Sequence, residues 1–545
     1  MYNIMRGKPL NFVIIQLKYT MGNFTISAVD LIIVVLYIGF IIWWGLKNAK
    51  SSDSKSYFLA GRSMPWWIVG LSLFAASISS TTLIGQSGDA YDTGLAVFNY
   101  NLTGIVVMVF FAVFLLPLYI RSKVFTIPEF LEKRFDKRSR FYFSTICIIG
   151  NIFLDAAGAL YAAALIIKLI YPSADLQTII IIFAAIAASY TIPGGLSSVI
   201  KTELIQAIIL IIGSIILTVF CFQQGGEYFI ELYRNGDMLS KLIRPIDDPA
   251  TPWLGLIVGM PILGIYFWAN NQTMVQRVLS AKSVDEGRKG VMLNGFLTML
   301  TLFIIAIPGL IARGLFPGLS RPDMVYPTMI INLMPVGLLA IILAALLSAL
   351  TSALSAILNS TSTLFTMDFY HYFNKNADSE KLVKVGKIAA LVIITIAALW
   401  APQIGRFSSL LKYYQEMLSY ISPPIVAAFL LGMFNKRVNG TGVFVGLLSG
   451  LSLAFFLLFF RVDIFGELHF LLIVPFLFVF SLLIMYLVSL FTSPPSFDKL
   501  ELTTFRVEDL EVELSNLKRG LWYKNYLWWG IILLFLSAIL WFIFS

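Results

Sequence analysis

The segment SLFAASISSTTLIGQSG, residues 72–88, has the length of a membrane-spanning helix but is interrupted by hydroxyl side chains. These are Ser72, Ser77, Ser79, Ser80, Thr81 and Thr82. A second segment, LIVGMPILGIYFWANNQ at residues 256–272, contains Gly259, Pro261 and Gly264. Small residues also serve helix–helix packing in membranes. However, the two segments are five predicted spans apart, and matching interruptions in two halves of a chain indicate discontinuous helices around a midplane site.

The composition predicts an all-helical integral membrane protein. Of the 545 residues, 58% are hydrophobic and only 13% are charged, which is more apolar surface than a soluble protein of this size can bury. The apolar runs are continuous and roughly twenty residues long, as a membrane helix requires. Strands of a membrane barrel would instead alternate over about ten residues.

We predict about fourteen transmembrane helices and a cytoplasmic side for their basic connections. The spans fall near residues 27–46, 66–86, 94–120, 141–171, 176–193, 197–223, 252–275, 288–313, 335–368, 383–402, 406–433, 440–460, 468–492 and 522–544. The connections at 47–65, 121–140, 276–289 and 369–387 are rich in lysine and arginine and all fall on one side. The positive-inside rule makes that side cytoplasmic and places both termini outside.

Residues 1–26 are predicted to be an N-terminal lead that precedes the first span. Their sequence has no small-residue cleavage site of the signal-peptide kind. Arg6, Lys8 and Lys18 would have to be translocated if translation began at Met1. We therefore expect the natural start to be Met21.

Several classes of protein find no support in the sequence. No Walker motif appears, so ATP-driven transport is not expected, and no HExxH or GxSxG motif marks a membrane enzyme. We therefore predict no catalytic residues, no cofactor and no nucleic-acid partner. Cys147 and Cys221 lie in apolar runs and are read as small core residues. A channel and a transporter-like solute sensor remain as alternatives.

Five stretches of the chain resemble the sodium/solute symporter family, most closely its bacterial sodium/sugar branch. They are YFLAGRSMPWWIVGLSLFAASIS (57–79), FTIPEFLEKRF (125–135), GGLSSVIKTELIQ (194–206), QRVLSAKS (276–283) and ALTSALSAILNSTSTLFTMDFY (349–370). The resemblance implies a LeuT-type core of five plus five helices in inverted repeat, with discontinuous first and sixth core helices. It also implies a monomer in the bacterial inner (plasma) membrane.

The resemblance implies the following division of the chain. Residues 27–46 would form an additional first span, residues 66–433 the transport core, residues 440–492 two peripheral spans, residues 493–521 a charged cytoplasmic linker and residues 522–545 the last span. The implied function is sodium-coupled secondary active import of a small organic solute, with a sugar or sugar derivative ranked first, by alternating access.

The resemblance also implies a sodium site between the first and eighth core helices. Its carbonyl donors would be Ala75, Ile78 and Ala349, and its hydroxyl donor Ser352. The next expected hydroxyl position is occupied by Ala353, so one ligand of the family pattern is missing. Sodium suits such a site because carbonyl and hydroxyl oxygens bind it without burying a net charge.

A second ion position is implied at Glu203, Ser352 and Ser355. A buried carboxyl group can take up a proton, because desolvation disfavours its charged form. Proton coupling through Glu203 or Asp155 is therefore an alternative to sodium coupling, and an interfacial acid near Lys201 is the structural alternative for Glu203.

The solute site implied by the family lies midway across the membrane. The residues expected to face it are Ser77, Ser79, Thr81, Thr82, Tyr100, Asn101, Asp155, Phe267, Trp268, Thr298 and Gln415. Of the residues that bind sugar hydroxyls in the hexose-carrying relatives, only Gln415 is present in this sequence. A hexose would therefore need different hydrogen bonds. Asp155 lies deep in its span, where a carboxylate normally faces a polar interior. We expect it to bind a solute hydroxyl or amine or to take a proton, with a structural hydrogen bond to Asn151 as the alternative.

Overall fold

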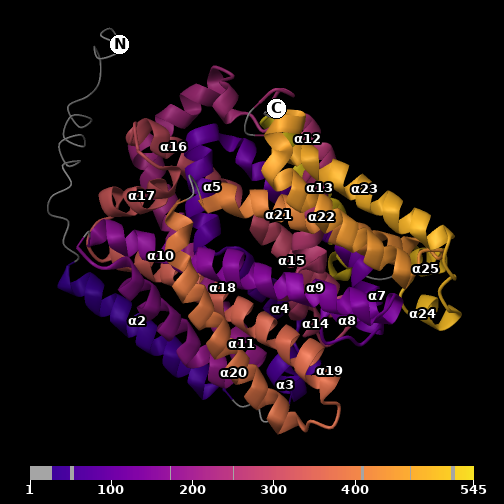
Figure 1. Cartoon of the computed structure of the whole chain (residues 1–545). Helices are drawn as coiled ribbons and strands as arrows, with labels where there is room; N and C mark the ends of the chain where they lie inside the picture. The colour runs from indigo at the N-terminus through magenta and orange to yellow at the C-terminus, as the bar shows by residue number, and fades with distance from the viewer. Residues whose placement is uncertain are drawn as a thin grey trace.

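The computed structural model of the protein describes residues 27–49, 54–171, 173–248, 251–406, 410–466, 468–516 and 522–545. Within these ranges the molecule consists of helices, connections and two isolated β-bridges, without a strand (Figure 1). The first part of the chain contains α2 (Ala28–Lys47), α3 (Ser54–Leu59), η1 (Ala60–Arg62), α4 (Trp66–Ser77), α5 (Ser80–Thr93), η2 (Leu95–Phe98), α6 (Asn99–Phe110), η3 (Phe111–Leu115), α7 (Leu116–Arg121), α8 (Ile127–Arg134), α9 (Lys137–Gly150), η4 (Asn151–Ala156), α10 (Ala157–Ile170) and α11 (Leu176–Arg234).

The middle of the chain contains η5 (Met238–Ser240), α12 (Trp253–Val258), α13 (Met260–Ile265), η6 (Tyr266–Asn270), α14 (Gln272–Leu279), α15 (Val284–Met299), η7 (Leu302–Ala306), α16 (Ile307–Leu315), η8 (Pro322–Met324), α17 (Val325–Leu333), α18 (Leu338–Leu364) and η9 (Phe365–Tyr370). The last part contains α19 (His371–Phe373), α20 (Ser379–Trp400), η10 (Ala401–Arg406), α21 (Leu410–Phe434), α22 (Gly440–Phe465), α23 (Phe470–Leu490), α24 (Phe497–Glu501), α25 (Val507–Asn516), η11 (Trp522–Lys524) and α26 (Tyr526–Ile543).

Fourteen membrane spans can be traced among the described residues. Twelve continuous helical segments are long and apolar enough to cross a membrane, and the bent pair α4–α5 forms a further span with a 59° break. One of the twelve, α11, has 59 residues and would be roughly 88 Å long if straight, far more than a hydrocarbon core of about 30 Å. Its backbone turns at Gly195 (φ 59°), so it forms two spans. The predicted all-helical membrane fold is confirmed.

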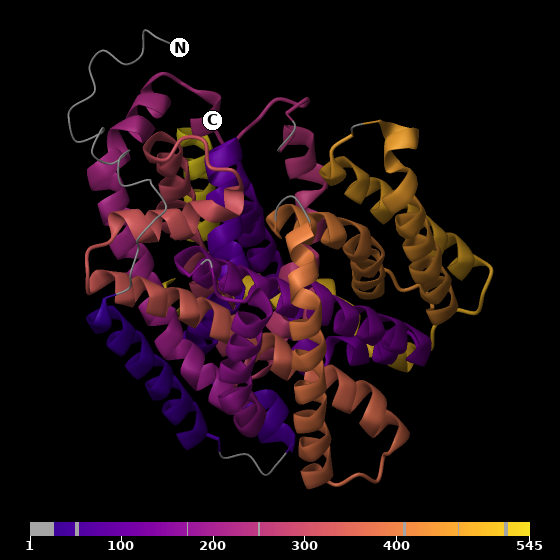
Figure 2. The same cartoon turned by 60° about the vertical axis from the view of Figure 1, so that its left-hand side comes forward.

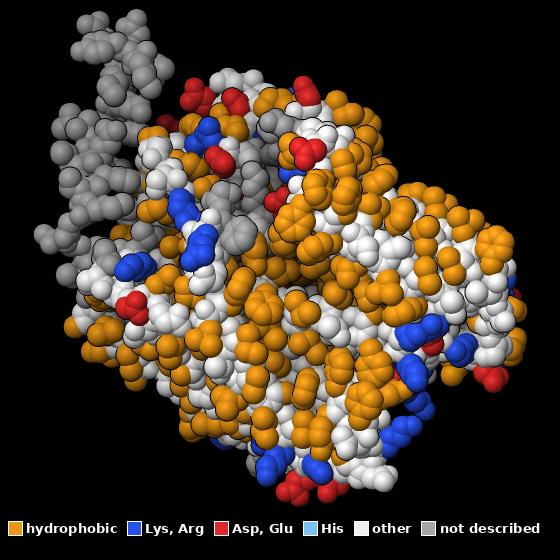
Figure 3. Space-filling view, viewed as in Figure 1, with side chains coloured by type: hydrophobic (Ala, Val, Ile, Leu, Met, Phe, Trp, Pro, Cys, Tyr) orange, Lys and Arg blue, Asp and Glu red, His pale blue; other side chains and the backbone are white. Residues whose placement is uncertain are grey.

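The helices are arranged around α18. The apolar window of α18 and its continuation is 89% buried, whereas that of α2 is only 17% buried. Helix α18 packs against α11, and α4 packs against α15. Figures 1 and 2 both place α2 on one side of the molecule and the α22–α23 pair on the opposite side. The outer helices present hydrophobic side chains, including Leu36 and Phe459, to the surroundings, and the face in Figure 3 is mainly hydrophobic between charged edges.

The break between α4 and α5 is built from the hydroxyl cluster noted in the sequence. Ile78 leaves the helical region (φ −92°, ψ 79°), and Ser79 caps α5 by accepting from the amide of Thr82. The Thr82 hydroxyl donates in turn to the Ser77 carbonyl at 3.0 Å. These side chains satisfy backbone groups that the interrupted helix leaves free.

The second break lies further along the chain than the sequence indicates. Gly259 keeps a helical backbone (φ −99°, ψ −54°), and Pro261 occupies the first turn of α13, where proline is tolerated. The backbone becomes extended at Asn271 (φ −70°, ψ 122°), which caps α14. The placement of this break at Gly259, Pro261 and Gly264 was wrong. Gly259 serves packing instead, because a Cβ there would lie 2.1 Å from the carbonyl oxygen of Leu471.

Gly259→Ala should lower the free energy of unfolding by about 1–3 kcal/mol, because the added methyl forces α12 and α23 apart. Gly39→Ala is the matched control, since a Cβ on Gly39 of α2 meets no atom within 4 Å. Thermal unfolding of both variants in detergent measures the difference. Equal midpoints for the two variants would contradict the packing role of Gly259.

Candidate ion-binding and solute-binding sites

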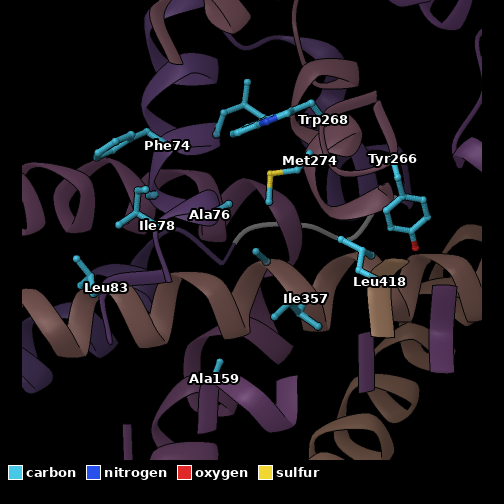
Figure 4. Packing of buried hydrophobic residues seen from close by; sticks show 14 of the residues in the cluster. Phe74, Ala76, Ile78, Leu83, Ala159, Tyr266, Trp268, Met274, Ile357 and Leu418 are labelled. Carbon is cyan, nitrogen blue, oxygen red and sulfur yellow. The ribbon is translucent and has the colours of Figure 1, made fainter. Parts of the chain in front are cut away.

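A cavity of about 150 Å³ lies where the two broken helices meet. Its walls come from the α4–α5 break, α6, η4, α10, α13, η6, α14, α15, α18 and α21. Figure 4 shows part of the apolar lining, with Ala76 and Ile78 from the break, Trp268 and Met274 beside the second break, and Ile357 from α18. The space exceeds severalfold what one water molecule needs. The cavity is therefore large enough for a small organic solute.

The structure brings all eleven predicted solute-facing residues to the lining of this cavity. They are Ser77, Ser79, Thr81, Thr82, Tyr100, Asn101, Asp155, Phe267, Trp268, Thr298 and Gln415. Phe267 and Trp268 lie on η6, a π-helical turn, with their rings edge-on at 4.9 Å between centroids. Asp155 lies on another π-helical turn, η4. Such turns frequently occur at functional sites.

A cluster of neutral polar side chains forms one part of the lining. Gln86 and Asn101 exchange two hydrogen bonds of 3.1 Å through their amides, and Asn101 also donates to Thr301 at 2.7 Å. Thr298 is buried, and its hydroxyl has no protein partner among the described residues. Sequence reasoning missed Gln86, although it follows Thr82 by four residues on α5 and so shares its face. This amide cluster is suited to binding solute hydroxyl groups.

Asp155 belongs to a separate group of hydrogen-bonded side chains. Its carboxylate accepts a hydrogen bond from Tyr414 of α21. The Asn151 amide, turned so that its oxygen accepts from the Thr361 hydroxyl, donates to Asp155 Oδ2 at 3.2 Å. Both the cavity position and the hydrogen bond to Asn151 considered from the sequence are therefore present together.

The oxygen atoms of the predicted sodium site lie next to this cavity. The Ser352 hydroxyl is 2.9 Å from the Ala75 carbonyl oxygen and 3.2 Å from that of Ala349. All three residues are buried, as is Ile78, where α4 ends. Ala353 lines the cavity with a methyl group in place of a hydroxyl. The geometry joins the Ala75 carbonyl, near the end of α4, to the Ala349 carbonyl and the Ser352 hydroxyl of α18, which is a donor set suited to a monovalent cation.

The three predicted ligands of the second ion position have separate partners. Glu203 forms an ion pair with Arg277 of α14 and accepts from the Ser72 hydroxyl of α4. The Ser355 hydroxyl instead donates to Tyr190 at 2.8 Å, and Ser352 contacts Ala75. The side chains of Glu203 and Arg277 are both 0% exposed. The guanidinium compensates the buried carboxylate without a proton or a sodium ion.

Arg277 was wrongly assigned to a cytoplasmic connection from the sequence. Every residue of α14 is buried, and the Arg277 guanidinium also donates to the Thr273 carbonyl. Two further side-chain pairs connect α14 to α18, namely Thr273 with Ser360 at 2.7 Å and Gln276 with Thr363 at 2.9 Å. The segment QRVLS could not be recognised from the sequence as a buried helix, because a basic residue such as Arg277 is also typical of exposed cytoplasmic loops.

Comparisons with known proteins agree with this architecture. The model of the "Sodium:solute symporter family" matches residues 57–450. The chain is 34% identical over 469 residues to sodium/glucose cotransporter 1 of Mus musculus, covering 78% of this chain and 70% of that protein. It is also 34% identical over 464 residues to sodium/myo-inositol cotransporter 2 of Homo sapiens, covering 78% and 69%.

Two solved structures share the fold. A Na⁺-coupled sialic acid symporter in a substrate-bound outward-open state has a TM-score of 0.77 at 22% identity, covering 86% of this chain and 99% of that one. Mhp1, a nucleobase-cation-symport-1 family transporter, has a TM-score of 0.56 at 13% identity, covering 84% and 99%. At these identities the likeness concerns the fold alone.

Proposed function

The chain belongs to the sodium:solute symporter family, and from this premise we propose that it imports a sugar or sugar derivative together with sodium by alternating access. The observation that carries the proposal is the neutral amide and hydroxyl cluster of Gln86, Asn101, Thr298 and Thr301 at a cavity adjoining the Ser352 group. Amide and hydroxyl side chains match the donors and acceptors of a polyhydroxylated solute.

Sodium is the proposed coupling ion at Ala75, Ile78, Ala349 and Ser352. One monovalent cation that moves down a potential of about 100 mV and a tenfold gradient releases about 3.7 kcal/mol. At one ion per solute this is enough to accumulate the solute by several hundred-fold. Proton coupling through Glu203 has less support, because Arg277 already compensates that carboxylate.

We propose that the chain works as a monomer in the cell membrane with both termini outside. The distribution of basic connections supports this orientation. A cysteine placed at Ser545 should react with a membrane-impermeant maleimide on intact cells. Cys147 and Cys221 are both buried, so labelling reports on residue 545 alone. Protection of that cysteine in intact cells, with labelling after lysis, would reverse the orientation. The bacterial inner membrane stays a prediction, as the relatives named above are mammalian.

Uptake into proteoliposomes tests the proposed function. Labelled glucose and myo-inositol should accumulate under an inward sodium gradient, and accumulation should vanish in potassium or when an ionophore collapses the gradient. Sodium-independent equilibration would indicate a channel. Binding without any uptake would favour a sensor.

Gln86→Leu should lower the kcat/KM for the transported sugar about tenfold to a hundredfold. The change removes a cavity amide and leaves Asn101 without its reciprocal partner. Gln177→Leu is the matched control, because the Gln177 amide contacts the Ala398 carbonyl away from the cavity. Equal kcat/KM values for the two variants would remove Gln86 from the solute site.

A further inference from the structure

Asp155 is the only formally charged side chain among the described residues that line the central cavity. The other polar lining residues are amides, hydroxyls and aromatic phenols or indoles. Among the described residues, no lysine, arginine or histidine lines the cavity. A solute in this cavity therefore meets one negative charge in an otherwise neutral surface.

The buried acids of the described chain, unlike the half-buried Asp155, are compensated. Glu203 pairs with Arg277, and Asp368 pairs with Arg140 at 2.7 Å while accepting from Thr126 and Ser144. Asp30 accepts from the backbone amides of Gly337 and Ala340, at the positive end of α18.

The last of these buried acids, Asp323, lies 3.2 Å from Arg321. Each buried acid thus has a guanidinium or a helix N-terminus beside it.

Asp155 has only neutral partners. They are the Tyr414 hydroxyl and the Asn151 amide, and no ion pair of Asp155 occurs among the described residues. A charged side chain at membrane depth is costly unless a counter-charge accompanies it. Because Asp155 faces the cavity, a cationic group of the solute can supply that charge.

We infer that the transported solute carries a protonated amine that pairs with Asp155, and that it belongs to the amino sugars or amino polyols. This inference rests on the proposed function, because the Gln86–Asn101 cluster binds the hydroxyl groups while Asp155 binds the ammonium. The ammonium would donate hydrogen bonds to the carboxylate, and the aromatic residues Phe267 and Trp268 line the same cavity. Neutral hexoses would leave the carboxylate uncompensated and bind more weakly.

The test compares binding of glucose with that of its 2-amino, 3-amino and 6-amino derivatives. The full-length protein in detergent with sodium chloride at neutral pH is titrated with each sugar, and the dissociation constant is measured by calorimetry. At least one amino sugar should bind tenfold or more tightly than glucose. Asp155→Asn should lower that ratio at least tenfold. Asp463→Asn, which removes an exposed acid on α22, should leave the ratio unchanged.

Each other outcome has a distinct meaning. Tighter binding of glucose than of every amino sugar would overturn the inference and leave sodium-coupled sugar import standing. Binding of none of the four sugars would overturn both. An unchanged amine preference in an Asp155→Asn variant that still unfolds cooperatively would remove Asp155 as the counter-charge.

Discussion

Ser352→Ala should weaken sodium binding at least tenfold. The variant removes the hydroxyl that lies within 3.2 Å of both the Ala75 and the Ala349 carbonyl oxygens. Because Ala353 already lacks a hydroxyl, the other hydroxyl position of the family pattern does not replace the lost oxygen. A tenfold weaker affinity reduces the stabilisation at saturating sodium by about 1.4 kcal/mol. Calorimetric titration with sodium chloride measures the dissociation constant directly.

Two further variants sharpen this result. Ser348→Ala removes a buried hydroxyl one turn earlier on α18, where it contacts Tyr37 and the Ala344 carbonyl, and should leave sodium affinity unchanged. Ala353→Ser adds the missing oxygen and should tighten sodium binding severalfold. If Ser352→Ala and Ser348→Ala bind sodium equally well, the ion is held elsewhere.

Arg277→Gln should destabilise the protein by about 3–5 kcal/mol and abolish transport. The change leaves the Glu203 carboxylate buried without a counter-charge, and a broken buried pair typically costs this much. It also releases α14 from α11 and α4, because Arg277 and Ser72 meet at Glu203. Thermal unfolding in detergent and uptake into proteoliposomes measure the two effects.

A double variant separates the charge from the contact. Arg277→Gln with Glu203→Gln removes both charges and should recover most of the lost stability, because no uncompensated charge remains. Transport should recover less, since the ion pair that joins α14 to α11 is still absent. A double variant as unstable as Arg277→Gln alone would show that packing, and not charge, dominates at this position.

Much of the fold could be predicted because lipid imposes simple rules. Long apolar runs locate the spans, and the hydroxyl-rich stretch at residues 77–82 marks the break that the structure places at Ile78. The second break was misplaced because glycine and proline have two uses in membrane helices. At Gly259 close packing against Leu471 decides the residue, whereas Asn271 caps the short helix after the break.

The predicted solute-facing residues all line the cavity. The ion pair between Glu203 and Arg277, in contrast, could not be predicted from the sequence. Glu203 and Arg277 are separated by 74 residues, and their pairing depends on how α11 and α14 cross. Gln86 shares the α5 face of Thr82 and could have been included from its spacing, but its pairing with Asn101 of another helix is visible only in the structure. Sequence patterns thus indicated which face of each helix is polar, whereas the structure was required to show which side chains on different helices contact each other.

The most direct test of sodium coupling is the thermal unfolding of the purified protein in sodium, potassium and choline chloride at equal ionic strength. An ion that binds the folded state stabilises it by RT ln(1 + [L]/Kd). We expect a higher unfolding midpoint in sodium than in the other two salts, rising with sodium concentration. Equal midpoints in all three salts would contradict a sodium site at Ala75, Ala349 and Ser352 and with it the proposed coupling.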